Sequence, residues 1–233
     1  MNIKVFIHFI DLPDSMYIAE EVIDDIFSSD LINNADFFIY CNYDITNFNW
    51  LKDRTLNYPN VSLIDHDATP EEFELSTLNE LKKFCDESTD DFNVLYLHHK
   101  GASRLRTRKH VHITDWRKYM TYFNVELWKD CVAALNTGYD TAGVEWTEKS
   151  NFPKHYSGNF WWATAKYIRS LPNIVRPSDN NFINNSQFGL KAHYRFDAEA
   201  WIGLSNPRAM SFNTSNIDHY RESYPAHLYR KQS

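Results

Sequence analysis

The chain has 233 residues, a net charge of −7 and 16% aromatic side chains. Its length fits one large domain, and its acidic balance argues against a general nucleic-acid binder, which needs a basic surface to neutralise phosphates. The three cysteines show no C-x-x-C spacing and no apolar run approaches the ~18 residues that span a bilayer, so we expect a cytoplasmic protein with neither a disulfide framework nor a transmembrane segment.

Strands and helices alternate in the first hundred residues. The patterns predict strands at residues 4–10, 36–41, 61–64 and 94–97, and helices at residues 15–27 and 69–84, the second opened by Thr69 as N-cap and Pro70 at its first helical position. This alternation is typical of an α/β protein with a mostly parallel central sheet and helices on both faces.

The second half continues with fewer regular segments. It predicts a long helix at residues 114–136, a strand at 141–146, a further strand approached through residues 155–162, a helix at 163–171 and a short apolar segment at 198–204. An Asn- and Ser-rich stretch, 173–190, is typical of a loop. Because neither an internal repeat nor a linker is visible, we expect residues 1–233 to form a single domain.

The fourth predicted strand runs directly into His98, His99, Lys100 and Gly101. Ligands of open α/β sheets bind outside the carboxyl ends of the strands. Lys100 and Arg104 could neutralise a diphosphate there, and Gly101 would let backbone amides approach its oxygens. The alternative is a solvated basic loop. His98 and His99 are neighbours on an extended segment and point to opposite sides, so only one readily faces a ligand.

Two clusters have the composition of metal sites. Asp65 and Asp67 flank His66 and could hold a divalent cation against a diphosphate, although acids near a helix start are also ordinary caps. His110 and His112 with Asp115 could suit zinc, although they lie in a basic segment just before a helix.

Aromatic side chains and one carboxylate suggest a sugar site. Trp161, Trp162 and Trp201 could stack on a pyranose, while Glu199 could accept a hydroxyl proton. The alternative is that the aromatic side chains belong to the core. Glu199 is harder to explain in that way, since a carboxylate within an apolar stretch needs a partner or a role.

Several signatures occur together along the chain: E-L-S-T-L at 74–78, Y-L-H-H-K-G-A-S at 96–103, Trp116-Arg117 with Met120, Gly143-Val144 before Trp146, the segment 158–163, and Glu199 with Trp201. In these the chain resembles small glycosyltransferases of the GT-A type, which occur in bacterial and viral polysaccharide gene sets and are distantly similar to rhamnan-synthesis proteins. The resemblance covers the chain from the first strand to about Leu204.

The resemblance implies a nucleotide-diphospho-sugar transferase fold with a nucleotide-sugar half, 1–103, and an acceptor-side half, 104–233. The implied donor-binding residues are His98, His99, Gly101, Ser103, Arg104, Thr77 and Asp11; the implied acceptor or sugar-binding residues are Gly158, Asn159, Trp161, Trp162 and Trp201. Glu199 matches the position of the acidic acceptor-side residue. The usual D-x-D follows the fourth strand, where this chain has His98-His99-Lys100, so either Mn²⁺ or Mg²⁺ binds elsewhere, at Asp65 and Asp67, or the enzyme is metal-independent.

The sequence thus predicts a transferase that moves a hexose or deoxyhexose from a nucleotide-diphosphate donor to a hydroxyl of a glycan acceptor. Glu199 would be the base, and Lys100 would stabilise the leaving diphosphate. Two alternatives remain open, a metal-dependent hydrolase that uses the His and Asp clusters and a non-catalytic carbohydrate-binding module that uses the aromatic side chains. A nucleotidyltransferase is disfavoured, because residues 10–13 provide no glycine-rich loop after the first strand.

Overall fold

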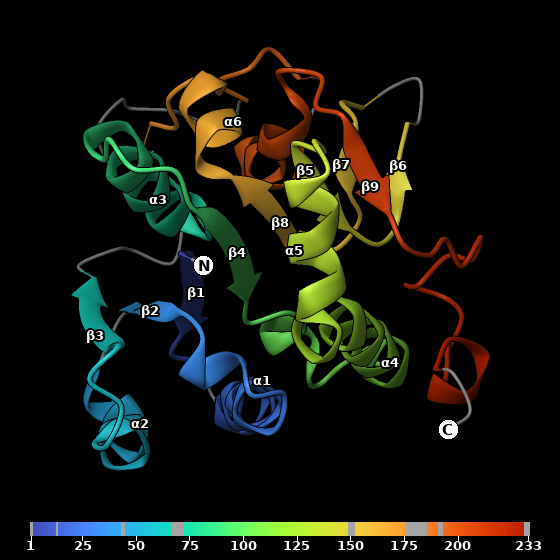
Figure 1. Cartoon of the computed structure of the whole chain (residues 1–233). Coiled ribbons are helices and arrows are strands. Elements are labelled where there is room, and N and C mark those ends of the chain that lie inside the picture. Colours follow the sequence, from blue (N-terminus) through green and yellow to red (C-terminus); the bar gives the residue numbers. More distant parts are fainter. Residues whose placement is uncertain are drawn as a thin grey trace.

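A computed structural model describes residues 2–12, 14–42, 45–66, 72–148, 152–175, 186–190 and 193–230. Within these ranges, a seven-stranded sheet has the order β3-β2-β1-β4-β8-β5-β9 (Figure 1). Its strands are β1 (Ile3–Ile10), β2 (Asp36–Asn42), β3 (Val61–His66), β4 (Asn93–His98), β5 (Thr141–Gly143), β8 (Trp161–Thr164) and β9 (Ala209–Ser211). β8 is antiparallel to both neighbours and the other pairs are parallel. The predicted α/β class with a mostly parallel sheet is confirmed.

Helices cover both faces of this sheet. The described helices are α1 (Met16–Ser28), α2 (Asn49–Thr55), α3 (Leu75–Glu87), α4 (His110–Thr121), α5 (Trp128–Asn136), α6 (Ala165–Ser170) and α8 (Asp197–Ala200). One apolar core joins the sheet to α1, α4 and α5, and a second joins it to α3, α6 and α8. Figure 1 shows α3 and α6 on one side of the sheet and α1 and α4 on the other. A two-stranded sheet of β6 (Trp146–Thr147) and β7 (His155–Tyr156) flanks β9.

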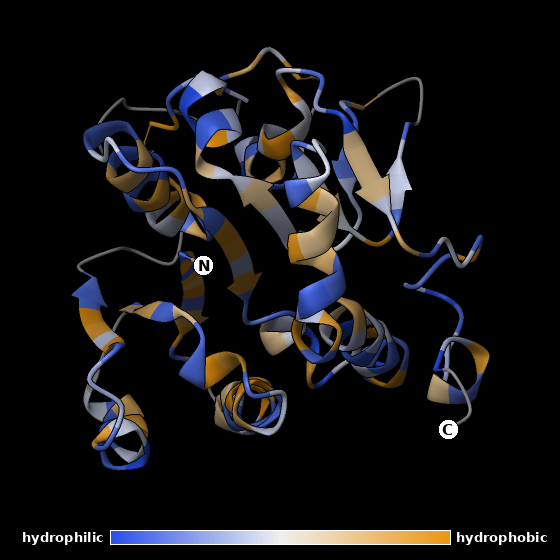
Figure 2. Ribbon diagram, viewed as in Figure 1, coloured by the Kyte–Doolittle hydropathy of each residue, from blue (hydrophilic) through white to orange (hydrophobic). Residues whose placement is uncertain are grey.

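Strand β4 is buried on both faces, which explains its continuous apolar sequence. Leu95 and Leu97 pack into the core with α1 and α4, whereas Val94 and Tyr96 pack into the core with α3. Figure 2 shows β1 and β4 as predominantly hydrophobic ribbons between more hydrophilic helix surfaces. Because side chains alternate along a strand, this register sends the residues that follow β4 toward different faces.

The prediction of one continuous helix at residues 114–136 is wrong. The helix begins earlier, at His110, and a π-helical turn, Tyr122–Glu126, separates α4 from α5. The carbonyl of Asn124 accepts a hydrogen bond from Trp162 Nε1 at 2.9 Å, so this widened turn is held by the sheet. The apolar pattern runs through the turn without a break, and it therefore predicts one helix.

Two other predicted elements differ in extent. The predicted strand 141–146 ends at Gly143, because Glu145 has a φ of +58° and turns the chain into β6. The predicted helix 69–84 begins later, at Leu75, because Phe73 has a φ of +49° and Glu72–Glu74 form a turn; Thr69 and Pro70 lie outside the described residues. None of the described helices has both the length and the apolar character needed to cross a membrane.

Candidate functional site

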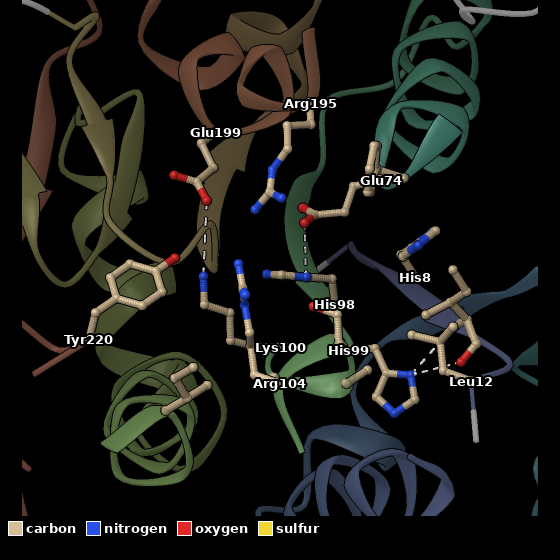
Figure 3. A pocket seen from close by; sticks show the side chains of 16 residues that line it. His8, Leu12, Glu74, His98, His99, Lys100, Arg104, Arg195, Glu199 and Tyr220 are labelled. Carbon is tan, nitrogen blue, oxygen red and sulfur yellow. Dashed lines mark hydrogen bonds and ion pairs between the residues drawn. The ribbon is translucent and has the colours of Figure 1, made fainter. Parts of the chain in front are cut away.

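A cavity of about 270 Å³ lies outside the carboxyl ends of β1 and β4. The chain proceeds from β1 to β2 on one side of the sheet, and β4 lies on the other side of β1, so the strand order reverses at this point. Such a reversal opens a crevice where open α/β sheets bind ligands. Figure 3 shows the residues that form its walls, which come from the end of β1 and just beyond (His8, Ile10 and Leu12), from the end of β4 and the turn after it (His98 to Arg104), from the turn before α3 (Phe73 and Glu74), and from Ile113, Arg195, Glu199 and Tyr220.

Lys100 and Glu199 face one another across this cavity. Lys100 Nζ lies 4.0 Å from Glu199 Oε1, and the same ammonium lies 4.2 Å from the centre of the Trp116 ring. Lys100 is 8% exposed. The two predicted catalytic residues, about a hundred positions apart in the sequence, therefore line one site. Arg104 and Arg195 also line it, and Figure 3 shows both guanidinium groups directed into the same space.

The backbone of Lys100 is fixed by α4. Arg117 donates from Nη1 to the carbonyl of Lys100 at 3.0 Å and from Nε to Glu21 of α1 at 2.9 Å. Gly101 follows with a φ of +97°, and a Cβ there would lie 3.0 Å from Ile113. Only glycine readily adopts this left-handed conformation. The turn after β4 is thereby held against two helices, with the lysine side chain left in the cavity.

Glu74 and His98 form a buried pair in the wall of the cavity. His98 Nδ1 lies 3.1 Å from Glu74 Oε1, and His98 donates from Nε2 to the carbonyl of Gly158 at 3.0 Å. The other carboxyl oxygen of Glu74 accepts a hydrogen bond from Asn159 Nδ2 at 2.6 Å. A carbonyl can only accept, so His98 must carry its proton on Nε2. Nδ1 then needs a second proton between it and Glu74.

The pKa shifts indicate where that proton lies. Burial and the nearby Lys100 ammonium lower the pKa of His98 to about 3, and burial raises the pKa of Glu74 even though Lys100 opposes the rise. Both directions favour neutral groups. Both shifts favour the arrangement in which the shared proton lies on the Glu74 carboxyl group and the His98 imidazole accepts the hydrogen bond.

His99 points away from His98, as the sequence predicts for neighbours on an extended segment (Figure 3). Its Nε2 lies 2.8 Å from the carbonyl of Ser15, and its Nδ1 contacts the backbone of Ile10. Burial lowers the pKa of His99 to about 4. His99 therefore fastens the end of β1 and the start of α1 to β4, while His98 belongs to the polar wall of the cavity.

The structure corrects the prediction that tryptophans form the sugar site. Trp161, Trp162 and Trp201 are all fully buried. Their indole nitrogens donate to Asn159 Oδ1, to the carbonyl of Asn124 and to the carbonyl of Pro172, respectively. These rings are core residues with satisfied polar atoms, so none can present a face to a pyranose.

Other predicted site residues are dispersed. Ser103 and Arg104 are exposed and line the cavity. Gly158 and Asn159 do not line the cavity, but they hydrogen-bond to His98 and Glu74, respectively. Thr77 is buried, and its hydroxyl oxygen lies 2.9 Å from His8 Nδ1. Asp11 accepts a hydrogen bond from Asn47. Neither Thr77 nor Asp11 lines the cavity.

The predicted metal clusters do not assemble in the described residues. Asp65 is exposed on β3 at the edge of the sheet, with β2 and β1 between it and β4, and Asp67 lies outside the described residues. His110 contacts the Tyr17 hydroxyl, and His112 contacts Ser223. Across the described ranges no three His, Cys, Asp or Glu side chains are grouped to hold a metal ion.

Glu74, Arg195 and Tyr220 line the cavity but were not predicted as site residues. A signal for Arg195 exists, because it precedes Glu199 by four residues and that spacing places both on one face of a helical turn. The structure has this turn, formed by Tyr194–Phe196 and α8. Glu74 opens the E-L-S-T-L signature at 74–78, whereas Tyr220 lacks a sequence signal, since tertiary packing alone brings it to the cavity.

A family model described as Domain of unknown function (DUF8361) matches residues 43–226. No curated protein matches the chain significantly.

Proposed function

The chain belongs to the family described as Domain of unknown function (DUF8361), and from its site we propose a glycosyltransferase of the GT-A type. It would transfer the hexose or deoxyhexose of a nucleoside-diphosphate sugar to a hydroxyl of a glycan and release the nucleoside diphosphate. The observation that carries this proposal is the Lys100 and Glu199 pair in a cavity at the strand-order reversal, accompanied by the guanidinium groups of Arg104 and Arg195.

The charges of the cavity suit a diphosphate. Three cations line it, namely Lys100, Arg104 and Arg195, against the two carboxyl groups of Glu74 and Glu199, and burial raises the pKa of Glu74, which favours its neutral form. Charge-assisted hydrogen bonds from ammonium and guanidinium groups are the strong contacts to phosphate oxygens. In the reaction, they would stabilise negative charge that develops as the bond between the anomeric carbon and the diphosphate breaks.

Glu199 is the base in this proposal. Its carboxylate would take the proton of the acceptor hydroxyl while that oxygen attacks the anomeric carbon, and the diphosphate would leave with the bonding electron pair. Lys100 lies close enough to Glu199 to contact both the carboxylate and the leaving group. Lys100, Arg104 and Arg195 line the space where the diphosphate would lie, so the proposal takes the chain's own cations as its counterions.

A titration with nucleoside diphosphates tests the proposal. Thermal-shift and calorimetric titrations with UDP, GDP, dTDP and CMP, each with and without Mn²⁺, should show selective stabilisation by one nucleotide in the absence of metal. Lys100→Ala should weaken that binding by at least tenfold. Arg108→Ala is the matched control, because Arg108 is exposed in the same basic segment and does not line the cavity. If the wild-type protein responds to no nucleotide, the proposal is wrong.

The base assignment has a separate readout. Glu199→Gln should retain nucleotide affinity and lose about 10²–10⁴-fold in transfer rate, the usual contribution of a general base. Transfer is measured as release of the nucleoside diphosphate from the sugar nucleotide that binds. Near-normal turnover in Glu199→Gln would remove Glu199 from this role.

A further inference from the structure

A second cavity, of about 540 Å³, adjoins the first. The ring of Tyr220 lines both, and Figure 3 shows its hydroxyl pointing toward the Lys100 and Glu199 pair. Trp116, which underlies the Lys100 ammonium, also lines the second cavity. A ligand in the second cavity would therefore lie next to the reacting groups proposed for the first.

Aromatic rings and small polar groups form its walls. The aromatic side chains that are only partly buried are Trp146 and Tyr220, and the small polar groups include Thr147, Ser157, Thr214 and Asn216. Rings that stack on the apolar face of a sugar, surrounded by amide, hydroxyl and carboxylate groups that bind its hydroxyls, are the chemistry that recognises a pyranose.

The charge of the second cavity differs from that of the first. Its described lining contains no lysine or arginine, and it contains Glu145 and Asp218. Burial opposes ionisation of Glu145, but hydrogen bonds from His219 and Ser215 outweigh burial and lower its pKa. Two acidic side chains with no lysine or arginine in the described lining disfavour a phosphate and leave a neutral, hydroxyl-rich ligand as the better fit.

The cavity wall is held in a fixed conformation. Glu145 has a φ of +58°, and its carboxylate accepts hydrogen bonds from the Ser215 amide at 2.5 Å and the Tyr119 hydroxyl at 3.2 Å. Its backbone amide donates to the carbonyl of Asn213. These bonds fasten residues 213–220 over the cavity. Strained backbone that its surroundings enforce is concentrated at binding sites.

Two buried nitrogens in this wall have no partner within the described ranges. They are Trp116 Nε1 and His219 Nδ1, and the two rings stack with centroids 5.1 Å apart. His219 is 4% exposed and Trp116 is 3% exposed. Buried polar atoms are almost always hydrogen-bonded, and exceptions call for a specific explanation. Trp116 Nε1 is a donor, and His219 Nδ1 is an acceptor when its Nε2 donates to Glu145; the hydroxyl groups of a bound sugar can both accept and donate.

We propose that the second cavity binds a neutral sugar ring, the one that carries the acceptor hydroxyl. The proposal rests on the glycosyltransferase function and replaces Trp161, Trp162 and Trp201 with Trp146 and Tyr220 as the sugar-facing aromatic side chains. The acceptor ring would stack in the second cavity and extend one hydroxyl past Tyr220 toward Glu199.

Direct binding of simple sugars tests this site. Calorimetric titration with methyl glycosides of glucose, galactose, mannose, rhamnose and N-acetylglucosamine should show saturable binding of at least one. Trp146→Ala should weaken that binding by tenfold or more and leave nucleoside diphosphate binding unchanged. Trp50→Ala is the matched control, because Trp50 is also half-buried and lies on α2 away from the cavity. Absence of binding by the whole panel, or unchanged binding in Trp146→Ala, overturns the proposal.

A second variant guards against misfolding of Trp146→Ala. Asn216 lines the cavity, is exposed and has a φ of +61°, so Asn216→Gly removes only the amide while keeping the backbone conformation. Asn206→Gly is its control, since Asn206 is exposed with a φ of +49° and lies outside the cavity. Sugar affinity should fall severalfold in Asn216→Gly alone, and equal affinities would contradict the site. Sugar binding without any nucleotide binding would preserve this site and reject the transferase function.

Discussion

Glu74 and His98 show how a buried polar pair can sit beside a charged site without adding charge to it. Ionised, the pair would place a carboxylate near Lys100 and a cation against the Gly158 carbonyl, with both groups removed from water. Neutral, it satisfies the same atoms with one proton between Oε1 and Nδ1. Burial favours the neutral form. The cavity then keeps its cations available for an anionic ligand.

Substitution of Glu74 distinguishes these two forms. In Glu74→Gln the amide nitrogen can donate to His98 Nδ1, and the amide oxygen can accept from Asn159, so the neutral network survives. We expect the free energy of unfolding to change by less than about 1 kcal/mol in Glu74→Gln, and to fall by about 1–3 kcal/mol for each unsatisfied partner in Glu74→Ala. Urea unfolding at pH 7 measures both. A loss of about 3–5 kcal/mol in Glu74→Gln would instead indicate a broken ion pair.

At the scale of elements, the segment before β8 approaches α4 closely. Gly158 has a φ of +96°, and a Cβ at this position would lie 2.3 Å from Met120 Sδ and 3.1 Å from Trp116. The carbonyl of the same residue holds His98. This contact ties the helix that carries Trp116 to the strand end that carries Lys100, so a change in it should reach the cavity.

Gly158→Ala should destabilise the protein for two reasons, backbone strain and overlap with α4. The left-handed conformation alone costs a non-glycine residue about 1–2 kcal/mol, and overpacking adds about 1–3 kcal/mol. Gly189→Ala is the control, because Gly189 has a φ of +72° and open space around its Cβ position. Thermal unfolding should show a larger loss for Gly158→Ala than for Gly189→Ala. Equal losses of stability in the two variants would mean that Met120 moves aside for the new methyl group without destabilising the protein.

Strands β1, β2 and β4 could be predicted because they are largely buried and read as apolar runs. β3 lies at the edge of the sheet with Ser62 and Asp65 exposed, and its predicted end differs most from the observed one, by two residues. The reversal of β8 could not be predicted, since a short strand buried on both faces looks the same in either direction. The break between α4 and α5 could not be predicted either, because a hydrogen bond from Trp162 of β8, distant in the sequence, stabilises it.

The site was predictable where chemistry and position coincide. Lys100 stands at the end of a buried strand, and Glu199 is a carboxylate in an apolar stretch; both line the cavity. Trp161, Trp162 and Trp201 misled because a core ring and a sugar-binding ring have the same composition. What separates them from Trp146 is burial, and burial depends on contacts between residues distant in the sequence.

At the scale of the whole molecule, the sheet brings three histidines together on or beside neighbouring strands. His8 of β1 pairs in register with His98 of β4, and His99 follows directly. Burial lowers the pKa of each, to about 3 for His98, to about 4 for His99 and well below the ordinary value for His8. All three are therefore neutral at pH 7 in the folded protein.

The contribution of His8 to the free energy of unfolding should therefore fall as the pH is lowered. Its pKa of 6.5 in the unfolded chain exceeds the folded value, so below pH 6.5 the unfolded state binds a proton that the folded state does not. Raised pKa values of Glu74 and Asp25 act in the opposite direction in the wild-type protein. A comparison with His8→Asn isolates the histidine, because the amide can keep a hydrogen bond to Thr77 and does not titrate.

Urea unfolding at pH 7.5 and pH 5 measures this difference. The stability of the wild-type protein relative to His8→Asn should fall by about 2 kcal/mol between these pH values, as a single proton taken up only by the unfolded state requires. The matched control is His227→Asn, whose parent residue is exposed near the C-terminus, and its relative stability should stay constant. If the stability of the wild-type protein relative to His8→Asn is the same at both pH values, His8 accepts a proton in the folded protein. The conclusion that His8 is neutral would then be wrong.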